Sequence, residues 1–384
     1  MQIEPFQIPF DPRTTDDLRA RLALTRWPDQ VNDDWASGTD WTYLRRLAEY
    51  WATGFDWGAQ VERLNRFPHF RARIDGNGIH LIHQRGRGPK PLPLVITHGW
   101  PGSFLEMLEI IPLLADPARH GADPADAFDV VVPSLPGYGF SDRPSAPGMD
   151  PVRIAALWRS LMVDGLGYRS FGVQGGDWGA SVSTRLALAA PDQVAGIHLN
   201  YIPGSYRPHL GPGSPPLSEA EARFLKQCEE WSDAEGAYAH IQRTKPQTLA
   251  YGLHDSPVGL AAWIIEKLRS WSDCNGELEG RWDRDELLTA VMLYWVTGTI
   301  GSSMRLYREA PRRPLWFGEG ERVRVPCGVA LFPAETPANP PRRWVERAYN
   351  VVRWTEMPRG GHFAAWEEPE LLAEDIRAFF RGLR

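Results

Sequence analysis

Short apolar runs and helical patterns alternate along most of this chain. Four apolar runs predict buried strands, at 92–97, 128–133, 170–174 and 194–199. The stretches around them predict helices, at 104–114, 154–166 and 180–190. Because strands that alternate with helices build a mostly parallel sheet covered by helices on both faces, the pattern predicts an α/β fold.

The first part of the chain, residues 1–85, predicts a helical arm that leads into the sheet. Thr14 or Thr15 is expected to cap the first of three helices, because a hydroxyl accepts a hydrogen bond from the free N–H groups of a helix start. The aromatic stripes on these helices are interpreted as packing surfaces. A hairpin turn at 75–78 is then expected to begin the sheet.

The alternation stops in the second half of the chain, where helical patterns replace the strands. These helices are predicted at 219–231, 234–243, 259–271 and 285–300, and the sheet resumes at 328–332. A helical insertion at this place is typical of a lid that closes over substrate. We therefore divide the chain into the arm (1–85), the first part of an α/β core (86–200), a helical lid (201–321) and the second part of the core (322–384).

Composition and charge limit the partners of the protein. The chain has 384 residues, of which 43% are hydrophobic and 23% charged, and this balance is typical of a folded protein with a large core. With 42 Lys and Arg against 48 Asp and Glu, the net charge is −6. Because no basic tract is present either, a nucleic-acid partner is not expected.

The sequence also indicates a compartment and the absence of bound groups. Three widely spaced cysteines, Cys228, Cys274 and Cys327, are interpreted as reduced core thiols. With no signal peptide and no apolar run long enough to cross a bilayer, a cytoplasmic protein without a membrane span is expected. No nucleotide-binding loop and no cluster spaced for a metal occurs, so neither cofactor nor metal is expected. His80 and His83 lie on a predicted strand and are interpreted as structural.

The most informative stretch is Gly-Gly-Asp-Trp-Gly at 175–179, between a predicted strand and a predicted helix. Small residues around a central nucleophile form the sharp, strained turn by which α/β hydrolases expose that nucleophile, here Asp177 in place of serine. An aspartate that attacks saturated carbon leaves an ester, which activated water can cleave, whereas a serine would leave a stable ether. The alternative is an ordinary Gly-Asp turn in a loop.

Two backbone amides are placed to stabilise a negative charge beside this aspartate. The strand at 92–97 runs into His-Gly-Trp-Pro-Gly-Ser at 98–103. In α/β hydrolases the loop after this strand supplies one N–H of the oxyanion hole, and the residue after the nucleophile supplies the other. The expected donors are the amides of Trp100 and Trp178.

An acid and a histidine follow in the chain order that α/β hydrolases use. Glu335 comes just after the predicted strand at 328–332, and His362 lies in a Gly-Gly loop before the last helix. Glu356 and Glu346 are rival acids, but the first lies on a predicted strand and the second in a predicted helix. Glu335 has the better position.

Several segments resemble the microsomal-type epoxide hydrolases, a family with the α/β-hydrolase fold. They are HGWPGSF (98–104), PSLPGYGFSD (133–142), QGGDWGA (174–180), DSPVGLAAWIIEK (255–267) and RGGHFAAWEEPELLAEDIR (359–377). The arm resembles the N-terminal domain of that family, so the resemblance covers nearly the whole chain. The family's membrane-anchored members begin with a hydrophobic segment that is absent here, and a soluble bacterial-type member is the better comparison.

The resemblance implies an activity and the residues that perform it. It implies that Asp177 opens an epoxide, and that His362, oriented by Glu335, hydrolyses the resulting ester to a vicinal diol. It also implies that Tyr238 and Tyr307 hold the epoxide oxygen. The chemistry agrees with this last role, because ring opening produces an alkoxide and phenols with a pKa of about 10 are still protonated at neutral pH.

The substrate and two other functions are left open by the sequence. Tryptophans in the predicted lid favour a bulky apolar or aromatic epoxide, met in detoxification or natural-product biosynthesis. A haloalkane dehalogenase uses the same aspartate turn, but a departing halide needs no proton from a tyrosine pair. A non-catalytic receptor for small molecules could keep the pocket without turnover. The oligomeric state is also open, a homodimer included.

Overall fold

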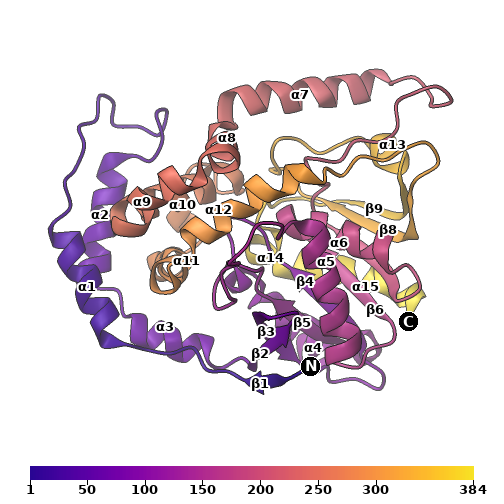
Figure 1. Ribbon diagram of the computed structural model, residues 1–384, viewed down its shortest axis with the longest axis horizontal. Helices are drawn as coiled ribbons and strands as arrows, with labels where there is room; N and C mark the ends of the chain where they lie inside the picture. The colour runs from indigo at the N-terminus through magenta and orange to yellow at the C-terminus, as the bar shows by residue number, and fades with distance from the viewer.

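A nine-stranded sheet forms the centre of the computed structural model, which describes residues 1–384. The strand order is β1-β2-β3-β5-β4-β6-β7-β8-β9 (Figure 1). The strands are β1 (Ile3–Pro5), β2 (His69–Ile74), β3 (Asn77–Gln84), β4 (Leu92–Thr97), β5 (Phe128–Pro133), β6 (Phe171–Gly175), β7 (Val194–Leu199), β8 (Val323–Leu331) and β9 (Tyr349–Glu356). All pairs from β5 to β9 in this order are parallel, which confirms the predicted α/β fold.

The other end of the sheet is antiparallel, and it differs in one respect from the prediction. β2 and β3 form the expected hairpin, with a turn at Asp75 and Gly76 that both take positive φ. The hairpin does not begin the sheet, however, because β1 pairs with β2 outside it. A strand of three residues has too little alternation to stand out in the sequence.

Helices cover both faces of the sheet. Helix α6 (Asp177–Ala189) packs with α5 (Pro151–Ser160) on one face, and α15 (Pro369–Phe380) packs with α4 (Ile110–Ala115) on the other. Two glycines of β6 show that the faces are opposite. A Cβ on Gly172 would meet Phe380 of α15, and a Cβ on Gly175 would meet the backbone of α6. Because these positions point to different sides of a strand, the helices sandwich the sheet.

Between β7 and β8 the chain forms the predicted helical insertion. Its helices are α7 (Glu219–Glu235), α8 (Ala237–Thr244), α9 (Pro246–Asp255), α10 (Pro257–Trp271), α11 (Arg284–Thr297) and α12 (Ile300–Glu309). The helix predicted at 285–300 is confirmed as α11, although α11 ends earlier, at Thr297, and α12 was not predicted. The chain bends by 86° between α11 and α12, because Gly298 ends α11 in the left-handed conformation.

The arm consists of α1 (Pro12–Ala23), α2 (Trp41–Thr53) and α3 (Trp57–Leu64), followed by the hairpin. The prediction of a threonine cap for α1 is wrong, because its cap is Asp11, which precedes a proline at the first helical position. The arm does more than lead into the sheet, since α1 and α2 pack against α10, and α3 packs against α11. In Figure 1 it encloses the lid from the side away from the C-terminus.

Prolines explain two further differences from the predicted elements. The expected helix at 104–114 is a 3₁₀ helix (Phe104–Met107) and then α4, because Pro112 in a continuous helix would clash with the preceding turn. Strand β8 starts at Val323, earlier than the strand predicted at 328–332, and its register with β9 shifts between Val323 and Pro326.

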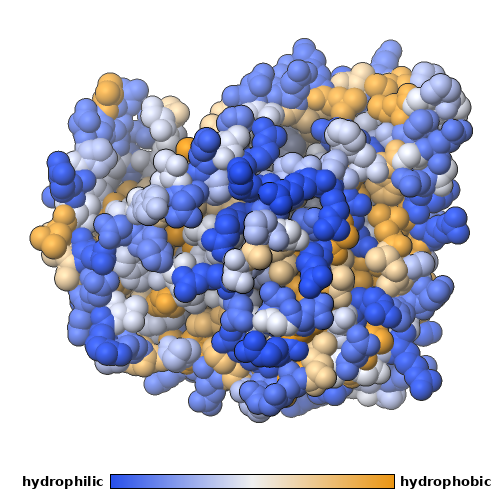
Figure 2. Space-filling view, viewed as in Figure 1, coloured by the Kyte–Doolittle hydropathy of each residue, from blue (hydrophilic) through white to orange (hydrophobic).

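The face in Figure 2 is mostly hydrophilic, with scattered hydrophobic patches. No single helix is long and apolar enough to span a bilayer, and the one pair of segments that reaches this length together, Arg284–Thr297 and Ile300–Arg312, is sharply bent.

Candidate active site

Asp177 occupies the sharp turn between β6 and α6. Its φ is 43°, so the strain predicted for this position is confirmed. The neighbouring glycines are required by close approach, since a Cβ on Gly175 would lie 2.4 Å from the backbone of Gly179, and one on Gly179 would lie 1.9 Å from the carbonyl oxygen of Thr97. The turn therefore presents the carboxylate at the carboxyl ends of the parallel strands, where open α/β sheets bind their ligands.

Glu335 and His362 lie beside this carboxylate, on the loops that follow β8 and β9. His362 Nδ1 is 2.6 Å from Glu335 Oε1, and His362 Nε2 is 3.6 Å from Asp177 Oδ2. The imidazole thus stands between the two acids, and its Nε2 has no hydrogen-bond partner. The rival acids lie elsewhere, because Glu346 pairs with Arg342 and Glu356 is exposed at the end of β9.

The two carboxylates control the charge of the imidazole. Burial opposes protonation of His362, but the negative charges of Glu335 and Asp177 and the hydrogen bond to Glu335 together outweigh it. The pKa of His362 therefore lies well above its usual range. An imidazolium ion between two carboxylates is the resting state that this arrangement favours.

The carboxylate of Asp177 also accepts a hydrogen bond from the backbone. The amide of Trp100 donates to Asp177 Oδ1 over 2.8 Å. Gly99 makes this approach possible, since a Cβ there would lie 2.2 Å from the same oxygen. The other expected donor, the amide of Trp178, lies in the first turn of α6, where N–H groups have no acceptor within the helix.

The two predicted tyrosines come from different lid helices and face each other near Asp177. Tyr238 lies in the first turn of α8 and Tyr307 in α12, with ring centroids 5.9 Å apart. Trp100 stacks on Tyr238 at 5.4 Å, and Trp178 meets Tyr307 edge-on at 4.8 Å. Burial and then the negative charge of Asp177 raise the pKa of Tyr238, while burial and Tyr238 raise the pKa of Tyr307. Both phenols are protonated at neutral pH.

A cavity of about 410 Å³ reaches Asp177, His362 and Tyr238 from beneath α7. Aromatic side chains form much of its wall: the lid tryptophan Trp271, and Tyr201, Phe224 and Trp344, which the sequence did not single out. A larger cavity of about 1010 Å³ between the arm and α10 touches none of the site residues, so size alone does not locate the site.

A second, much smaller cavity of about 20 Å³ lies against Asp177 and His362. Its wall includes Glu106 and Asn200. Burial raises the pKa of Glu106 to about 8, with the negative charge of Asp177 adding to the shift. This volume is about that of one water molecule with polar partners around it. Sequence reasoning missed both residues, because only the folded chain brings them behind the nucleophile.

The sheet, the strained turn and the helical insertion define an α/β hydrolase. A family described as "alpha/beta hydrolase fold" matches residues 93–227, and one described as "Epoxide hydrolase N terminus" matches residues 3–107. The chain is 44% identical over 387 residues to a Stigmatella aurantiaca protein provisionally named an epoxide hydrolase, covering 100% of this chain and 86% of the relative. It is 40% identical over 402 residues to epoxide hydrolase 1 of Sus scrofa, covering 98% and 88%.

Solved structures agree with these sequence relatives. The epoxide hydrolase of Aspergillus niger matches with a TM-score of 0.86 and 31% identity, covering 100% of this chain and 97% of that one. The juvenile hormone epoxide hydrolase of Bombyx mori matches with a TM-score of 0.82 and 32% identity, covering 100% and 94%. The chain belongs to the epoxide hydrolase family and is an enzyme of that class, so its substrates are an epoxide and water.

Proposed function

We propose that the enzyme opens its epoxide through a covalent ester on Asp177. The carboxylate attacks one carbon of the three-membered ring, and the carbon–oxygen bond to that carbon breaks. Tyr238 and Tyr307 hold the ring oxygen, and one of them donates the proton that turns the alkoxide into a hydroxyl group. The observation that carries the proposal is the line of Glu335, His362 and Asp177 opposite two protonated phenols.

In the second step water cleaves the ester. Esterification removes the negative charge of Asp177, which is one of the causes of the raised pKa of His362. The imidazole then loses its proton more readily, and this proton restores the phenol that was deprotonated in the first step. The neutral imidazole can act as the base that activates water, while Glu335 holds its Nδ1–H. The small cavity beside Asp177 and His362 offers a place for this water. The amides of Trp100 and Trp178 stabilise the oxyanion, and the product is a vicinal diol.

The aromatic cavity supports a bulky apolar or aromatic epoxide as substrate. Its volume of about 410 Å³ lies in the range of pockets that enclose small organic molecules. Juvenile hormone is named as the substrate of several relatives, and we carry over only the general class of a large, mostly apolar epoxide. Detoxification and natural-product biosynthesis are both compatible with that class.

Neither a haloalkane dehalogenase nor a non-catalytic receptor is favoured. A departing halide accepts no proton, so it gives no reason for two protonated phenols beside the nucleophile. Binding without turnover does not require an acid and a histidine in line with a strained carboxylate, so this arrangement does not favour a receptor.

The proposal is tested by the first turnovers of an aryl epoxide in ¹⁸O-water. We expect His362→Gln to accumulate an adduct whose mass equals protein plus epoxide, located on Asp177. Repeated turnover of the wild-type enzyme should place ¹⁸O in the Asp177 carboxylate, because water attacks the ester carbonyl. Asp177→Ala is the matched control and should form no adduct. Diol formation without an adduct in His362→Gln and without ¹⁸O in the protein would contradict the covalent route.

A further inference from the structure

The lid directly contacts the loop that carries His362, residues 357–363, which we call the histidine loop. The contact is made by the lid residues where α10 ends. The backbone N–H of His362 donates to the carbonyl oxygen of Trp271 over 2.9 Å. Two residues earlier in the loop, the N–H of Gly360 donates to Asp273 Oδ2 over 2.8 Å. The approach is so close that a Cβ on Gly361 would lie 2.7 Å from the carbonyl oxygen of Trp271. The lid thus supplies both acceptors for this part of the loop.

A buried carboxylate on α14 (Ala364–Glu367) completes the connection from the other side. Glu367 Oε1 accepts from the N–H of Phe363 over 2.9 Å, and Glu367 Oε2 accepts from the N–H of Asp273 over 2.7 Å. The residue is 5% exposed, so water does not compete for these bonds. One carboxylate therefore joins the histidine loop to the lid segment that holds the loop.

The same lid segment forms part of the wall of the substrate cavity. The ring of Trp271 lies 5.1 Å from that of Tyr238 and 5.1 Å from the imidazole of His362. Asp177, in contrast, is held by the glycines of its own turn and by the amide of Trp100. No hydrogen bond joins it to Asp273 or Glu367. The position of the base depends on the lid, and the position of the nucleophile depends on the sheet.

We propose that Asp273 and Glu367 are positioning residues that hold His362 for hydrolysis of the ester, and that they contribute little to the formation of the ester. The inference rests on the proposed covalent mechanism. In that mechanism the imidazole acts as a base only in the second step, where its Nε2 must reach water and its Nδ1 must stay on Glu335. Loss of the acceptor at Asp273 leaves the N–H of Gly360, two residues before the base, without a partner, so that the loop is held there only by the hydrogen bond from the N–H of Ala334 to the carbonyl oxygen of Gly360.

Asp273→Ala tests the proposal in rapid-quench measurements of both steps with an aryl epoxide. We expect hydrolysis of the ester to slow about 10- to 100-fold, the range that a displacement of about 1 Å costs a positioned group. Formation of the ester should change less than about threefold. The ester then accumulates, kcat and KM fall together, and kcat/KM is nearly unchanged.

Conservative variants separate positioning from a general loss of structure. Asp273→Asn keeps a carbonyl acceptor for Gly360 and should restore hydrolysis to within about threefold of wild type. Glu367→Gln keeps only one of two acceptors and should accumulate the ester to an intermediate level. Asp255→Ala, which removes a lid aspartate that pairs with Arg21 of the arm, is the control and should accumulate none. The thermal midpoint of unfolding is measured for each variant, and the rates are compared only among variants whose midpoints agree with that of the wild type.

Two results would overturn the positioning role. One is an equal loss of both steps in Asp273→Ala, and the other is an Asp273→Asn variant as slow as Asp273→Ala. Failure of the covalent mechanism itself would give a different result, because His362→Gln would then form no ester. An ester in His362→Gln without one in Asp273→Ala would reject the role of the lid segment alone.

Discussion

The charge on His362 depends on whether Asp177 is a carboxylate or an ester. In the resting enzyme the imidazole has an acid on each side, and the pKa of His362 is raised. A group with a raised pKa stabilises the folded protein most below its unfolded pKa, and this contribution is lost as the pH rises through the folded pKa. Ester formation removes one of the two acids, so the same group becomes a stronger acid at the moment when a free base is required.

Asp177→Asn imitates the uncharged ester and should lower the pKa of His362. We expect a shift of at least about one pH unit, because one of two close carboxylates is replaced by an amide. The pKa is measured by NMR titration of ¹⁵N-labelled imidazole in the wild-type and variant proteins. In Glu335→Gln, the control, the pKa should also fall, since either acid contributes. An unchanged pKa in Asp177→Asn would contradict the coupling between the nucleophile and the base.

The tyrosines are expected to act as a pair on the first step. Replacing one phenol by phenylalanine, as in Tyr238→Phe or Tyr307→Phe, leaves the other to hold the oxygen and should lower the rate of ester formation about 10- to 100-fold. The double variant should lose far more, because the alkoxide then has no donor. Tyr251→Phe, a change at an exposed tyrosine of α9 that does not line the cavity, is the control and should stay within about threefold of wild type. Equal rates in the double variant and wild type would remove the tyrosines from the mechanism.

At the residue scale, the sequence could predict those candidate catalytic residues whose order along the chain is typical of the fold. Asp177, Glu335 and His362 could be chosen because strand ends in a parallel sheet meet at one edge and the chain order of the acid and base is known. The tyrosines came from family resemblance alone, since nothing in their local pattern marks them among eleven. Asp273 was missed because its role depends on a hydrogen bond to a residue 87 positions away.

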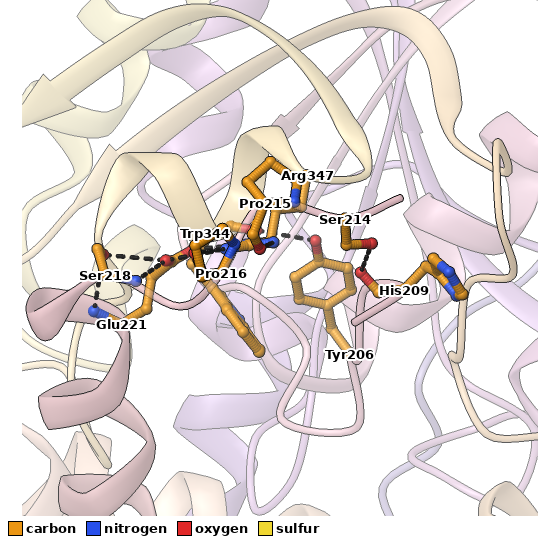
Figure 3. A network of polar contacts seen from close by, with 9 residues as sticks. All are labelled: Tyr206, His209, Ser214, Pro215, Pro216, Ser218, Glu221, Trp344 and Arg347. Carbon is orange, nitrogen blue, oxygen red and sulfur yellow. Dashed lines mark hydrogen bonds and ion pairs between the residues drawn. The ribbon is translucent and has the colours of Figure 1, made fainter. Parts of the chain in front are cut away.

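At the scale of elements, α7 is attached to the core mainly at its first turn. Glu221 is the one fully buried residue of the helix, and it forms an ion pair with Arg347 over 2.6 Å (Figure 3). Arg347 also donates to the carbonyl oxygens of Pro215 and Pro216, just before the helix. Because Phe224 and other residues of α7 form a wall of the substrate cavity, this ion pair determines where that wall lies.

Removal of the arginine in Arg347→Met should detach α7. A buried carboxylate without its partner typically costs about 3 to 5 kcal/mol, and the cost is limited here to the free energy of opening α7 locally. We expect rapid proteolysis within α7 and a higher KM for bulky epoxides, with the sheet still folded. The double variant Glu221→Met with Arg347→Met leaves no unpaired charge and should recover most of the protection. Equal protease sensitivity of wild type and Arg347→Met would show that other contacts hold the helix.

The same ion pair gives a pH dependence with a definite sign. The hydrogen bonds from Arg347 lower the pKa of Glu221 to about 2. A carboxyl group with a lowered pKa stabilises the fold above its unfolded pKa, and this stabilisation is lost as the pH falls through the folded value. The attachment of α7 is therefore expected to be fully present above the ordinary carboxyl pKa, to weaken progressively as the pH falls below it, and to be lost near the folded pKa of about 2.

The helices also show which elements the pattern could predict. The helix predicted at 219–231 begins at the expected residue as α7, because its cap, Ser218, is local in sequence. The end of α11 was predicted too late, since this helix is apolar on most sides and its apolar pattern continues across Gly298 to Ile300. Burial of α11 between the arm and α10 overrides the usual one-sided pattern.

At the scale of the molecule, the lid is held by the arm on one side and by the core on the other. The core holds it through the histidine loop and through the ion pair between Arg347 and α7. Two arm side chains donate to lid residues: Thr39 to the carbonyl oxygen of Ala262 in α10 over 2.7 Å, and Tyr50 to the carboxylate of Asp285 in α11 over 2.8 Å. The sequence could not predict this arrangement, because each contact joins segments more than 200 positions apart. Long-range packing of this kind leaves no local pattern.

Removal of both contacts, in Thr39→Val with Tyr50→Phe, should loosen the lid without changing the sheet. Each hydrogen bond is worth about 1 kcal/mol, so the opening equilibrium of α10 and α11 should rise roughly 10- to 30-fold. Hydrogen exchange followed by mass spectrometry should show this increase in peptides from both helices and none in β4 or β6. Thr53→Val is the matched control, because its hydroxyl bonds only to Glu49 within α2. If exchange rose equally in the sheet, the arm would stabilise the whole fold and not the lid in particular. The positioning of His362 by Asp273 and Glu367 would then not depend on the arm.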